Sequence, residues 1–460
     1  MEAVSRMNLA SLVQSQKQYH AGGETLDADF RIRMLRKLQE AIRRFVPALQ
    51  DALAADLGKS ETEAFMTELG VTMAELSFTL KNLHRWARPR KVRTPLTHFG
   101  TRSTIIPEPY GSVLIIAPWN YPVFLSLPPL IGAIAAGNCA VVKPSELAPA
   151  TSGVLAELIS ATFPPEYVAV VQGEADTSQA LLREPFDYIF FTGSTAIGRK
   201  VMEAAAVHLT PHTLELGGKS PCIVHGDARL ELAARRIAWG KLLNAGQTCV
   251  APDYILVQRE VKRRFVDALK AEIVRQAGDA LGGADYPRIV SEKHYSRLLG
   301  LLEGQHVLYG GRGDASRLRL EPTLVDEPDP ESPLMSEEIF GPILPIISYG
   351  ETEEAIRFVQ ERPKPLALYV FTENGAVQRD VLRRVSFGGG CVNDTVYHLS
   401  SPYLPFGGVG ASGLGAYHGQ ASFETFSHHK SVLKQTTSFD LPFRYMNFKG
   451  SLALMKRLLK

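Results

Sequence analysis

Residues 112–144, SVLIIAPWNYPVFLSLPPLIGAIAAGNCAVVKP, contain the pattern that decides the fold. The stretch has no charged side chain before Lys143, so a membrane span of about 20 apolar residues has to be considered first. Four prolines between positions 118 and 129 interrupt the run and argue against one continuous helix. The pattern instead predicts a strand at 112–117, a short helix at 128–137 and a strand at 139–144, with both strands buried as in a parallel sheet.

On both sides of this stretch, strand patterns and helix patterns follow one another. Upstream, apolar residues at helical spacing predict helices at 31–57 and 62–84. Downstream, the chain alternates between helices that begin near residues 150, 177 and 197 and β-rich runs at 167–173, 187–194 and 213–218. A second alternating set has its strands at 220–226, 253–258, 366–372 and 389–394. This alternation predicts two α/β domains, each with a mostly parallel sheet.

The composition is that of a soluble globular protein rather than a nucleic-acid binder. The chain has 460 residues, enough for two or three domains, with 45% apolar residues and a net charge of +2. None of its four cysteines has the CxxC spacing, which argues against a disulfide framework and a zinc ribbon. We therefore expect a reducing, cytoplasmic location and no metal site. The N-terminus lacks a secretory signal, and the basic C-terminal stretch 451–460 predicts a short surface helix, not a membrane anchor.

A basic run covers residues 85–103, with six Arg or Lys side chains and two prolines. Such a run can bind nucleic acid, but a solvated connector or an edge strand is the more common structure. We favour the connector or edge strand, and a steep salt dependence of DNA affinity would support the other interpretation.

Two strand ends carry groups that suit a nucleotide. In FTGSTAIG, residues 191–198, Gly193, Ser194 and Gly198 lie where a strand passes into a helix, and the helix N-terminus offers free N–H groups to a phosphate. A plain strand–turn–helix has the same appearance. In KPSE, Lys143 and Glu146 could bond a ribose at the end of a strand, or could be a surface lysine and the start of a helix.

Three further residues are candidates for chemistry. Glu215 in TLELGGKSP is flanked by leucines, and a desolvated carboxylate there would suit a general base, although alternation alone does not tell which side it faces. Cys249 in NAGQTC follows a predicted helix and is either an activated nucleophile or an inert buried thiol. Asn120 in WNYP has N–H donors that suit an oxyanion hole or a turn cap.

Taken in order, these motifs resemble the aldehyde dehydrogenase superfamily from about residue 31 to 435. The series is APWNYP, KPSE, FTGSTAIG, LELGGKSP, NAGQTC, EEIFGPILP and PFGGVGASGLG. The stretches SPCIVHG, RRIAWGKLLNAGQTCVAPDYIL and AYHG are most similar to the class 3 branch, which holds fatty, aromatic and coniferyl aldehyde dehydrogenases.

The resemblance implies NAD(P)-dependent oxidation of an aldehyde, medium- or long-chain aliphatic or aromatic, to the carboxylic acid. Cys249 would attack the aldehyde to give a thiohemiacetal and then a thioester, Asn120 and the Cys249 N–H would hold the oxyanion, and Glu215 would be the general base. Tyr121 and His418 would line the substrate tunnel. The residues implied in cofactor binding are Trp119, Lys143, Glu146, Gly193, Ser194, Gly198, Leu216, Gly217, Glu338 and Phe340.

The resemblance also implies a cofactor preference. Glu146 should repel a 2′-phosphate and so favour NAD, while NADP remains possible because class 3 relatives often use it with the same motif. One departure is Ala411, where relatives commonly carry Asn, and we expect it to loosen the wall of the substrate entrance.

The implied architecture is two Rossmann-like parallel-sheet domains with a small β flap for oligomerisation, and the implied assembly is a homodimer. We expect a nucleotide domain at 1–84 and 107–211, a catalytic domain at 212–396, a bridging flap at 85–106 and 397–440, and a tail at 441–460.

Two alternatives stay open. A cysteine esterase using Cys249 and Glu215 would turn over esters without nucleotide, and a catalytically silent relative would bind NAD without turnover. The joint presence of Asn120, Glu215, Cys249 and Glu338 argues against the silent relative, because such a protein needs none of them.

Overall fold

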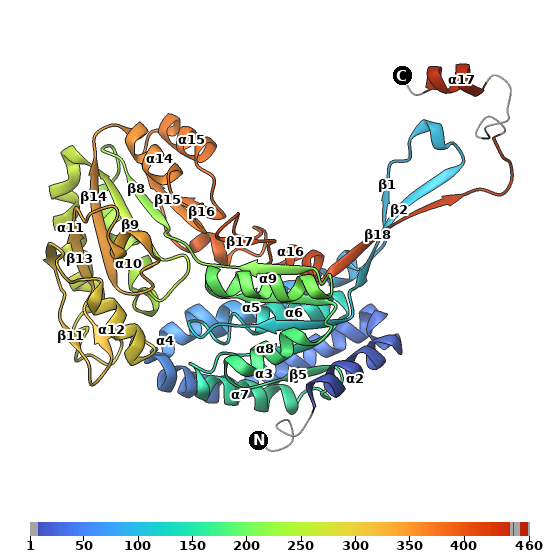
Figure 1. Ribbon diagram of the computed structural model, residues 1–460, viewed down its shortest axis with the longest axis horizontal. Helices are drawn as coiled ribbons and strands as arrows, with labels where there is room; N and C mark the ends of the chain where they lie inside the picture. The colour runs from blue at the N-terminus through green and yellow to red at the C-terminus, as the bar shows by residue number, and fades with distance from the viewer. Residues whose placement is uncertain (1–7, 442–444, 446–450, 459–460) are drawn as a thin grey trace.

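The computed structural model describes residues 8–441, Tyr445 and 451–458. Two α/β lobes form its body, and a thin arm projects from one of them (Figure 1). The first lobe contains a six-stranded sheet in the order β17-β7-β6-β3-β4-β5, parallel except for β17. Its strands are β3 (Ser112–Ile116), β4 (Cys139–Lys143), β5 (Val168–Val170), β6 (Tyr188–Thr192), β7 (His212–Glu215) and β17 (Gly413–Leu414).

The central strand pair β3 and β4 is buried throughout, as predicted from the apolar runs. Side chains alternate across the sheet: Val113 and Ile115 pack with α3, α5, α6 and α7, while Leu114 and Ile116 pack with α2, α8 and α9. The predicted strand–helix–strand unit at 112–144 is therefore confirmed. The helices of this lobe are α2 (Leu9–Ala21), α3 (Ala28–Leu57), α4 (Glu61–Ala64), α5 (Gly70–Trp86), α6 (Leu127–Ala136), α7 (Pro149–Ser160), α8 (Ala175–Arg183) and α9 (Thr195–Val207), with a short turn η1 (Glu24–Leu26).

The predicted helix at 31–57 is confirmed as α3, but the one predicted at 62–84 is interrupted. A wider π-helical turn, η2 (Phe65–Leu69), separates α4 from α5. This turn carries Glu68, which is fully buried and accepts hydrogen bonds from the backbone N–H groups of Val123 and Phe124. Single π-turns inside helices often occur at functional sites.

The second lobe contains a seven-stranded sheet in the order β10-β13-β14-β9-β8-β15-β16, in which only β10 is antiparallel. The four strands predicted here are confirmed. Its strands are β8 (Pro221–Val224), β9 (Tyr254–Gln258), β10 (Val307–Tyr309), β13 (Thr323–Asp326), β14 (Ile343–Tyr349), β15 (Ala367–Phe371) and β16 (Gly389–Val392), beside a small hairpin of β11 (Gly313–Asp314) and β12 (Arg319–Leu320). The helices are α10 (Leu230–Leu242), η4 (Leu243–Gly246), η5 (Arg259–Val261), α11 (Lys262–Ala277), α12 (Glu292–Gly300), α13 (Pro333–Ser336), α14 (Thr352–Gln360), α15 (Gly375–Arg384) and η6 (Tyr397–Ser400).

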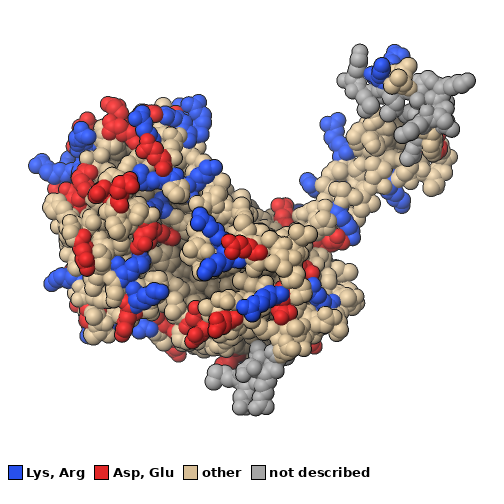
Figure 2. Space-filling model, viewed as in Figure 1, with Lys and Arg blue, Asp and Glu red and all other residues tan. Residues whose placement is uncertain are grey.

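The arm is a three-stranded antiparallel sheet of β1 (Arg90–Val92), β2 (Thr101–Pro109) and β18 (Ser427–Gln435), with η3 (Leu96–His98) at its tip. The basic run therefore forms an edge strand and its neighbour, one of the two structures favoured above. Figure 2 shows acidic and basic side chains mixed over the visible face of the body.

The segment 397–426, which we expected to belong to the flap, contains β17 and α16 (Gln420–Thr425). β17 pairs with β7 of the first sheet, and α16 packs against α6. The predicted C-terminal helix is present as α17 (Ser451–Leu458). Within residues 8–441, Tyr445 and 451–458, no helix is long and apolar enough to cross a membrane.

Candidate active site

Two cavities meet at Cys249. Both have largely apolar walls, but one also contains charged side chains and is called the polar cavity, while the other is called the apolar cavity. The polar cavity, of about 320 Å³, lies at the ends of β3, β6 and β7 and faces the 337–340 loop. The apolar cavity, of about 240 Å³, lies between α5, α10 and the 396–418 segment. Cys249 and Leu125 line both. The predicted site residues in the polar cavity are Trp119, Asn120, Gly193, Ser194, Glu215, Leu216, Gly217, Cys249, Glu338 and Phe340.

The NAGQ sequence builds a fixed loop that presents Cys249. Asn244, Ala245 and Gly246 all have positive φ, at 50°, 51° and 74°, a conformation that costs energy in residues other than glycine. A Cβ at Gly246 would lie 2.2 Å from the carbonyl oxygen of Gly341. The Gln247 side chain then ties the loop to its surroundings, donating to the carbonyls of Asn244 and Arg288 at 3.0 Å and accepting from the N–H of Val290 at 3.0 Å.

The Cys249 thiol holds its proton in this state. Burial raises its pKa to about 12, and the carboxylates of Glu338 and Glu215 act in the same direction. The backbone N–H groups of Cys249 and Val250 point toward the sulfur and oppose this effect in part. A positive charge bound nearby would favour the thiolate, which is the nucleophilic form.

Asn120 is held in place through both its side chain and its backbone carbonyl. Its amide Nδ2 donates to the Gln247 carbonyl at 3.1 Å, while its own carbonyl accepts from Asn244 Nδ2 at 2.8 Å and from Lys59 Nζ at 3.0 Å. Lys59 is in turn paired with Glu68 at 2.6 Å, and both side chains are fully buried. Sequence reasoning missed Lys59 and Glu68, because nothing in the local pattern of a surface-like KSETE stretch shows that it turns inward.

Glu215 faces the polar cavity, which settles the orientation that alternation left open. It ends β7, is 2% exposed, and its two carboxylate oxygens have no hydrogen-bond partner within the described part of the chain. Burial raises its pKa well above the ordinary value. A carboxyl of this kind can take and return a proton near neutral pH.

The turn between β6 and α9 places Gly193 and Ser194 in the wall of the polar cavity at the N-terminus of α9, the end of a helix that favours an anion. Ser194 caps α9 by accepting from the N–H of Ile197, and Gly193 donates its N–H to the carbonyl of Glu215 at 3.0 Å. Gly198 lies one turn into α9. It does not line the cavity, and a Cβ there would lie 2.6 Å from the Leu216 side chain, so it permits close packing of helix and strand.

Lys143 and Glu146 lie at the end of β4, outside the residues that line the polar cavity. Lys143 Nζ bonds Glu146 Oε2 at 2.9 Å, with the lysine side chain 2% exposed and the glutamate 41% exposed. Burial raises the pKa of Glu146, but the hydrogen bond and charge of Lys143, together with the backbone N–H of Glu146, lower it by more, so the pKa lies below its ordinary value. A carboxylate at a strand end, held charged and open to solvent, suits a ribose.

Glu338 lies directly against Gly217. A Cβ at Gly217 would be 1.9 Å from Glu338 Oε2, so only glycine leaves room for this carboxylate. Burial and the charge of Asp253 raise the pKa of Glu338 to about 8, while a hydrogen bond from the Gly218 N–H acts in the opposite direction. Phe340, at φ 50°, packs edge-on against Trp119 with ring centroids 5.3 Å apart.

Tyr121 and His418 line the apolar cavity, as predicted for the tunnel. Tyr121 bonds the hydroxyl of Thr248, the residue before Cys249, at 2.6 Å. His418 stacks on Tyr417, and burial lowers its pKa to about 3, so the ring is neutral. Ala411 lines neither cavity, and its carbonyl accepts from Thr195 in α9. The other tunnel residues include Met66, Val71, Phe124, Trp239, Leu243, Val396, Leu399 and Phe406.

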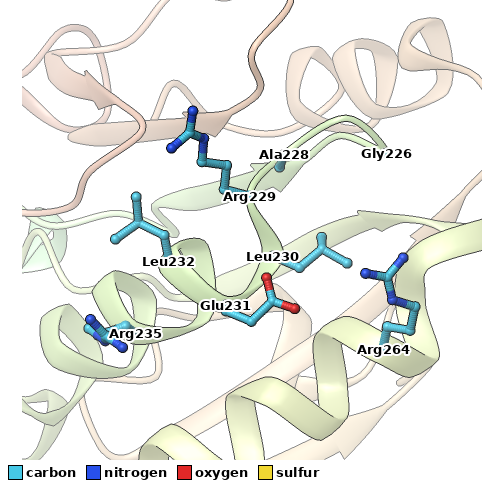
Figure 3. A pocket seen from close by; sticks show the side chains of 8 residues that line it. All are labelled: Gly226, Ala228, Arg229, Leu230, Glu231, Leu232, Arg235 and Arg264. Carbon is cyan, nitrogen blue, oxygen red and sulfur yellow. The ribbon is translucent and has the colours of Figure 1, made fainter.

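A further cavity, of about 410 Å³, lies at the start of α10 beside α11 (Figure 3). Its three arginines do not point toward one another. Arg229 lies 3.6 Å from Glu373, and Arg235 lies 3.2 Å from Glu272. Because two of the three cations already have partners, this cavity is not a converging anion site. The residues described here include no group of three or more His, Cys, Asp or Glu placed to hold a metal ion.

Comparison with known proteins agrees with this geometry. The profile of the aldehyde dehydrogenase family matches residues 2–432, so the chain belongs to that family. It is 47% identical to the 4,4'-diaponeurosporen-aldehyde dehydrogenase of Staphylococcus aureus over 95% of this chain and 96% of that one. It is 45% identical to the dimeric NADP-preferring aldehyde dehydrogenase of Rattus norvegicus, covering 93% and 94% of the two chains.

The fold comparison gives the same result. A structure of Staphylococcus aureus AldH in a substrate-bound state superposes with a TM-score of 0.97 at 46% identity, covering 99% of this chain and all of that one. The predicted α/β fold and the class 3 resemblance are thus confirmed. The chain is an NAD(P)-dependent aldehyde dehydrogenase, and its reaction is the oxidation of an aldehyde to a carboxylic acid.

Proposed function

We propose that Cys249, Asn120 and Glu215 carry out this oxidation. The main support is the position of Cys249, whose side chain lines both the polar and the apolar cavity. The Cys249 thiol gives its proton to solvent, and the thiolate sulfur then forms a bond to the aldehyde carbon. The carbonyl π bond breaks as this bond forms, so that the oxygen becomes an oxyanion. Asn120 Nδ2 and the Cys249 N–H donate to this oxyanion, as preorganised donors do in other acyl-transfer sites.

The nicotinamide end of the nucleotide would occupy the polar cavity, and the adenine end would extend beyond it toward the end of β4. Glu338 would hold the nicotinamide ribose, Gly193 and Ser194 the pyrophosphate, and Lys143 and Glu146 the adenine ribose. The fit is supported by the Gly217 position, where a Cβ would collide with the Glu338 carboxylate. When bound, NAD(P)⁺ supplies the hydride acceptor. Trp119 and Phe340 pack at this side of the cavity and help to exclude water.

Glu215 completes the reaction. After oxidation the acyl group is bound to Cys249 as a thioester. Glu215 takes a proton from a water molecule, whose oxygen bonds the acyl carbon as the carbon–sulfur bond breaks. The carboxylic acid leaves, the thiolate of Cys249 is restored, and the proton on Glu215 is released to solvent.

NAD is the preferred nucleotide in this proposal. The charged Glu146 would repel a 2′-phosphate near the adenine ribose. Glu146→Gln should therefore raise the ratio of kcat/KM with NADP to kcat/KM with NAD by about 3- to 10-fold, because it removes one repulsion between like charges. A ratio that stays the same in Glu146→Gln would place the discrimination elsewhere.

The substrate is an apolar aldehyde, medium- or long-chain aliphatic or aromatic. The tunnel walls are almost entirely apolar and aromatic, and its histidine is neutral. The name of the Staphylococcus aureus relative, which refers to 4,4'-diaponeurosporen-aldehyde, supports a large apolar substrate.

We further propose a homodimer in the cytoplasm. The dimeric rat relative and the exposed strand β18 of the arm support the dimer. Four cysteines without disulfides support a reducing compartment. A light-scattering mass of one subunit at micromolar concentration would contradict the dimer.

The test of the whole proposal is reduced-nucleotide formation by the purified protein. Short, long and aromatic aldehydes are offered with NAD and then with NADP, beside Cys249→Ala. We expect turnover that requires Cys249 and improves with apolar chain length. Ester turnover without nucleotide, or nucleotide binding without any turnover, would instead support one of the two alternatives.

A further inference from the structure

Two charged residues within the sequence motifs have no part in the mechanism above. Lys219 follows the two glycines of LELGGKSP, and Asp253 lies in the APDYIL stretch that follows Cys249. Their side chains form an ion pair and are only 10% and 5% exposed. Neither lines a cavity that holds the reacting groups. Removing two charges from water is costly, so the pair needs a compensating set of contacts.

Those contacts surround Glu338. Lys219 Nζ donates to the carbonyls of Leu334 and Glu337 at 2.9 Å, just before Glu338 in the chain. Asp253 Oδ1 accepts from the N–H of Ile339 at 3.0 Å, just after it. The ion pair therefore holds the backbone on both sides of a residue whose own side chain points the other way, toward Gly217.

The same short segment also shapes the pocket for the carboxylate. Gly217 leaves the space that Glu338 Oε2 occupies, and the Gly218 N–H bonds the carboxylate. Lys219, the next residue, fixes the loop from which Glu338 projects. Arg297 of α12 reaches that loop from another side, bonding Glu337 at 2.9 Å and the Ile339 carbonyl at 2.6 Å. Three consecutive residues after β7 thus determine where the Glu338 carboxylate lies.

We infer that the Lys219–Asp253 ion pair is a positioning device for nucleotide binding, which acts by fixing the Glu338 carboxylate. This inference rests on the proposed ribose-binding role of Glu338. It assigns no contact with the nucleotide to Lys219 or Asp253. Arg297 also holds the loop that carries Glu338, through its bonds to Glu337 and Ile339. Loss of the ion pair should therefore weaken nucleotide binding without abolishing it.

The test measures the dissociation constant of NAD by quenching of tryptophan fluorescence, since Trp119 lines the nucleotide cavity. Lys219→Met should raise this dissociation constant about tenfold, which is the size of effect expected from the loss of one hydrogen bond to a charged group. The KM for the aldehyde at saturating NAD should change by less than about twofold. Asp253→Asn keeps the oxygen that accepts from Ile339 and should give a smaller loss, which provides a second variant if Lys219→Met fails to fold.

Two control variants separate positioning from charge and from general stability. Lys241 is buried near Glu338 and Asp253, but its Nζ has no hydrogen-bond partner among the residues described here. Lys241→Met removes charge without releasing the loop, so an equal loss in it would overturn the inference. Lys262 pairs with Asp326 at 2.6 Å elsewhere in the same lobe, and Lys262→Met should leave NAD binding unchanged.

A double-mutant cycle with Glu338→Gln decides whether Lys219 acts through Glu338. If it does, Lys219→Met should change NAD affinity by less than about twofold in the Glu338→Gln background. A tenfold loss that persists there would overturn the inference. If Glu338→Gln binds NAD normally, the proposed role of Glu338 fails and the inference with it; if only Lys219→Met binds normally, the inference alone fails.

Discussion

The two cavities that meet at Cys249 are built in different ways. The polar cavity is formed by short segments at the ends of parallel strands, and its residues belong to compact motifs around 119, 193, 215 and 338. The apolar cavity is formed by side chains from four distant parts of the chain, namely 66–71, 121–125, 239–250 and 396–418. Backbone geometry thus defines the nucleotide side, while side-chain size and shape define the aldehyde side.

This difference in construction determines which residues tolerate substitution: those of the nucleotide side tolerate little, and those of the aldehyde side tolerate more. On the nucleotide side, a Cβ at Gly217 would collide with Glu338, and one at Gly193 with the Phe191 ring, so small changes are costly. On the aldehyde side, tunnel residues such as Met66 and Val71 can change size without disturbing a strand end. Substitutions on the two sides should therefore have separable effects on nucleotide and on aldehyde.

The largest effect should come from the residue that both cavities share. Cys249→Ala removes the nucleophile, and dehydrogenase activity should fall by at least about 10⁴-fold. Because the polar cavity keeps its other walls, the dissociation constant of NAD, measured by fluorescence titration, should change by less than about twofold. Residual activity close to the parent level would show that another group attacks the aldehyde.

Glu215→Gln should slow the release of the acid by about 10²- to 10⁴-fold, the usual contribution of a general base. The first turnover should still occur, so stopped-flow absorbance should show a burst of reduced nucleotide followed by a slow steady state. Glu215→Asp is the matched control, because it keeps a carboxylate and should recover part of the rate. A normal steady state in Glu215→Gln would mean that another base activates the water.

Val71→Asp tests the aldehyde side alone. It places a carboxylate in the apolar tunnel, where desolvation and lost packing should lower kcat/KM for a long-chain aldehyde by about 10- to 100-fold. Val71→Leu keeps the tunnel apolar and serves as the control. An equal loss of NAD affinity in Val71→Asp would contradict the separation of the two sides.

The smallest effect should be a pH dependence confined to the nucleotide side. The pKa of Glu338 is raised to about 8, so its carboxyl is mostly protonated at about pH 7 and charged at about pH 9. A charged carboxylate accepts ribose hydroxyl hydrogen bonds better, so NAD affinity should rise with pH, by up to about tenfold. Glu338→Gln should flatten this profile in calorimetric titrations at several pH values, and an unchanged slope would exclude Glu338 as its source.

The nucleotide side was largely predictable from sequence, for a physical reason. Strands β3 and β4 are short, carry no charge before Lys143 and are flanked by prolines or glycines, so both could be recognised. Parallel strands carry their functional groups at one edge of the sheet, and the polar residues that follow these strands were therefore candidates. Cys249 was predictable as a loop residue because α10 ends before it.

The parts that were not predicted depend on contacts distant in sequence. Strand β14 contains Pro345, and a proline argues against a central strand because it lacks an N–H. The proline is tolerated because only β13 pairs with β14 at this position, while β9 pairs with it from Ile346 onward. The orientation of Glu215 and the inward turn of Lys59 depend on packing between segments far apart. The tunnel walls have no periodicity of their own, so sequence pattern could not assemble them.

The meeting of the two cavities at a single sulfur has a consequence for inhibition. A compound that fills the tunnel and one that fills the nucleotide cavity touch different residues except at Cys249 and Leu125. Both can therefore occupy the enzyme together, and a tunnel-filling compound should be noncompetitive toward the nucleotide. A single molecule that linked the tunnel-filling compound to the compound in the nucleotide cavity would combine their binding energies, because binding of one part raises the effective concentration of the other.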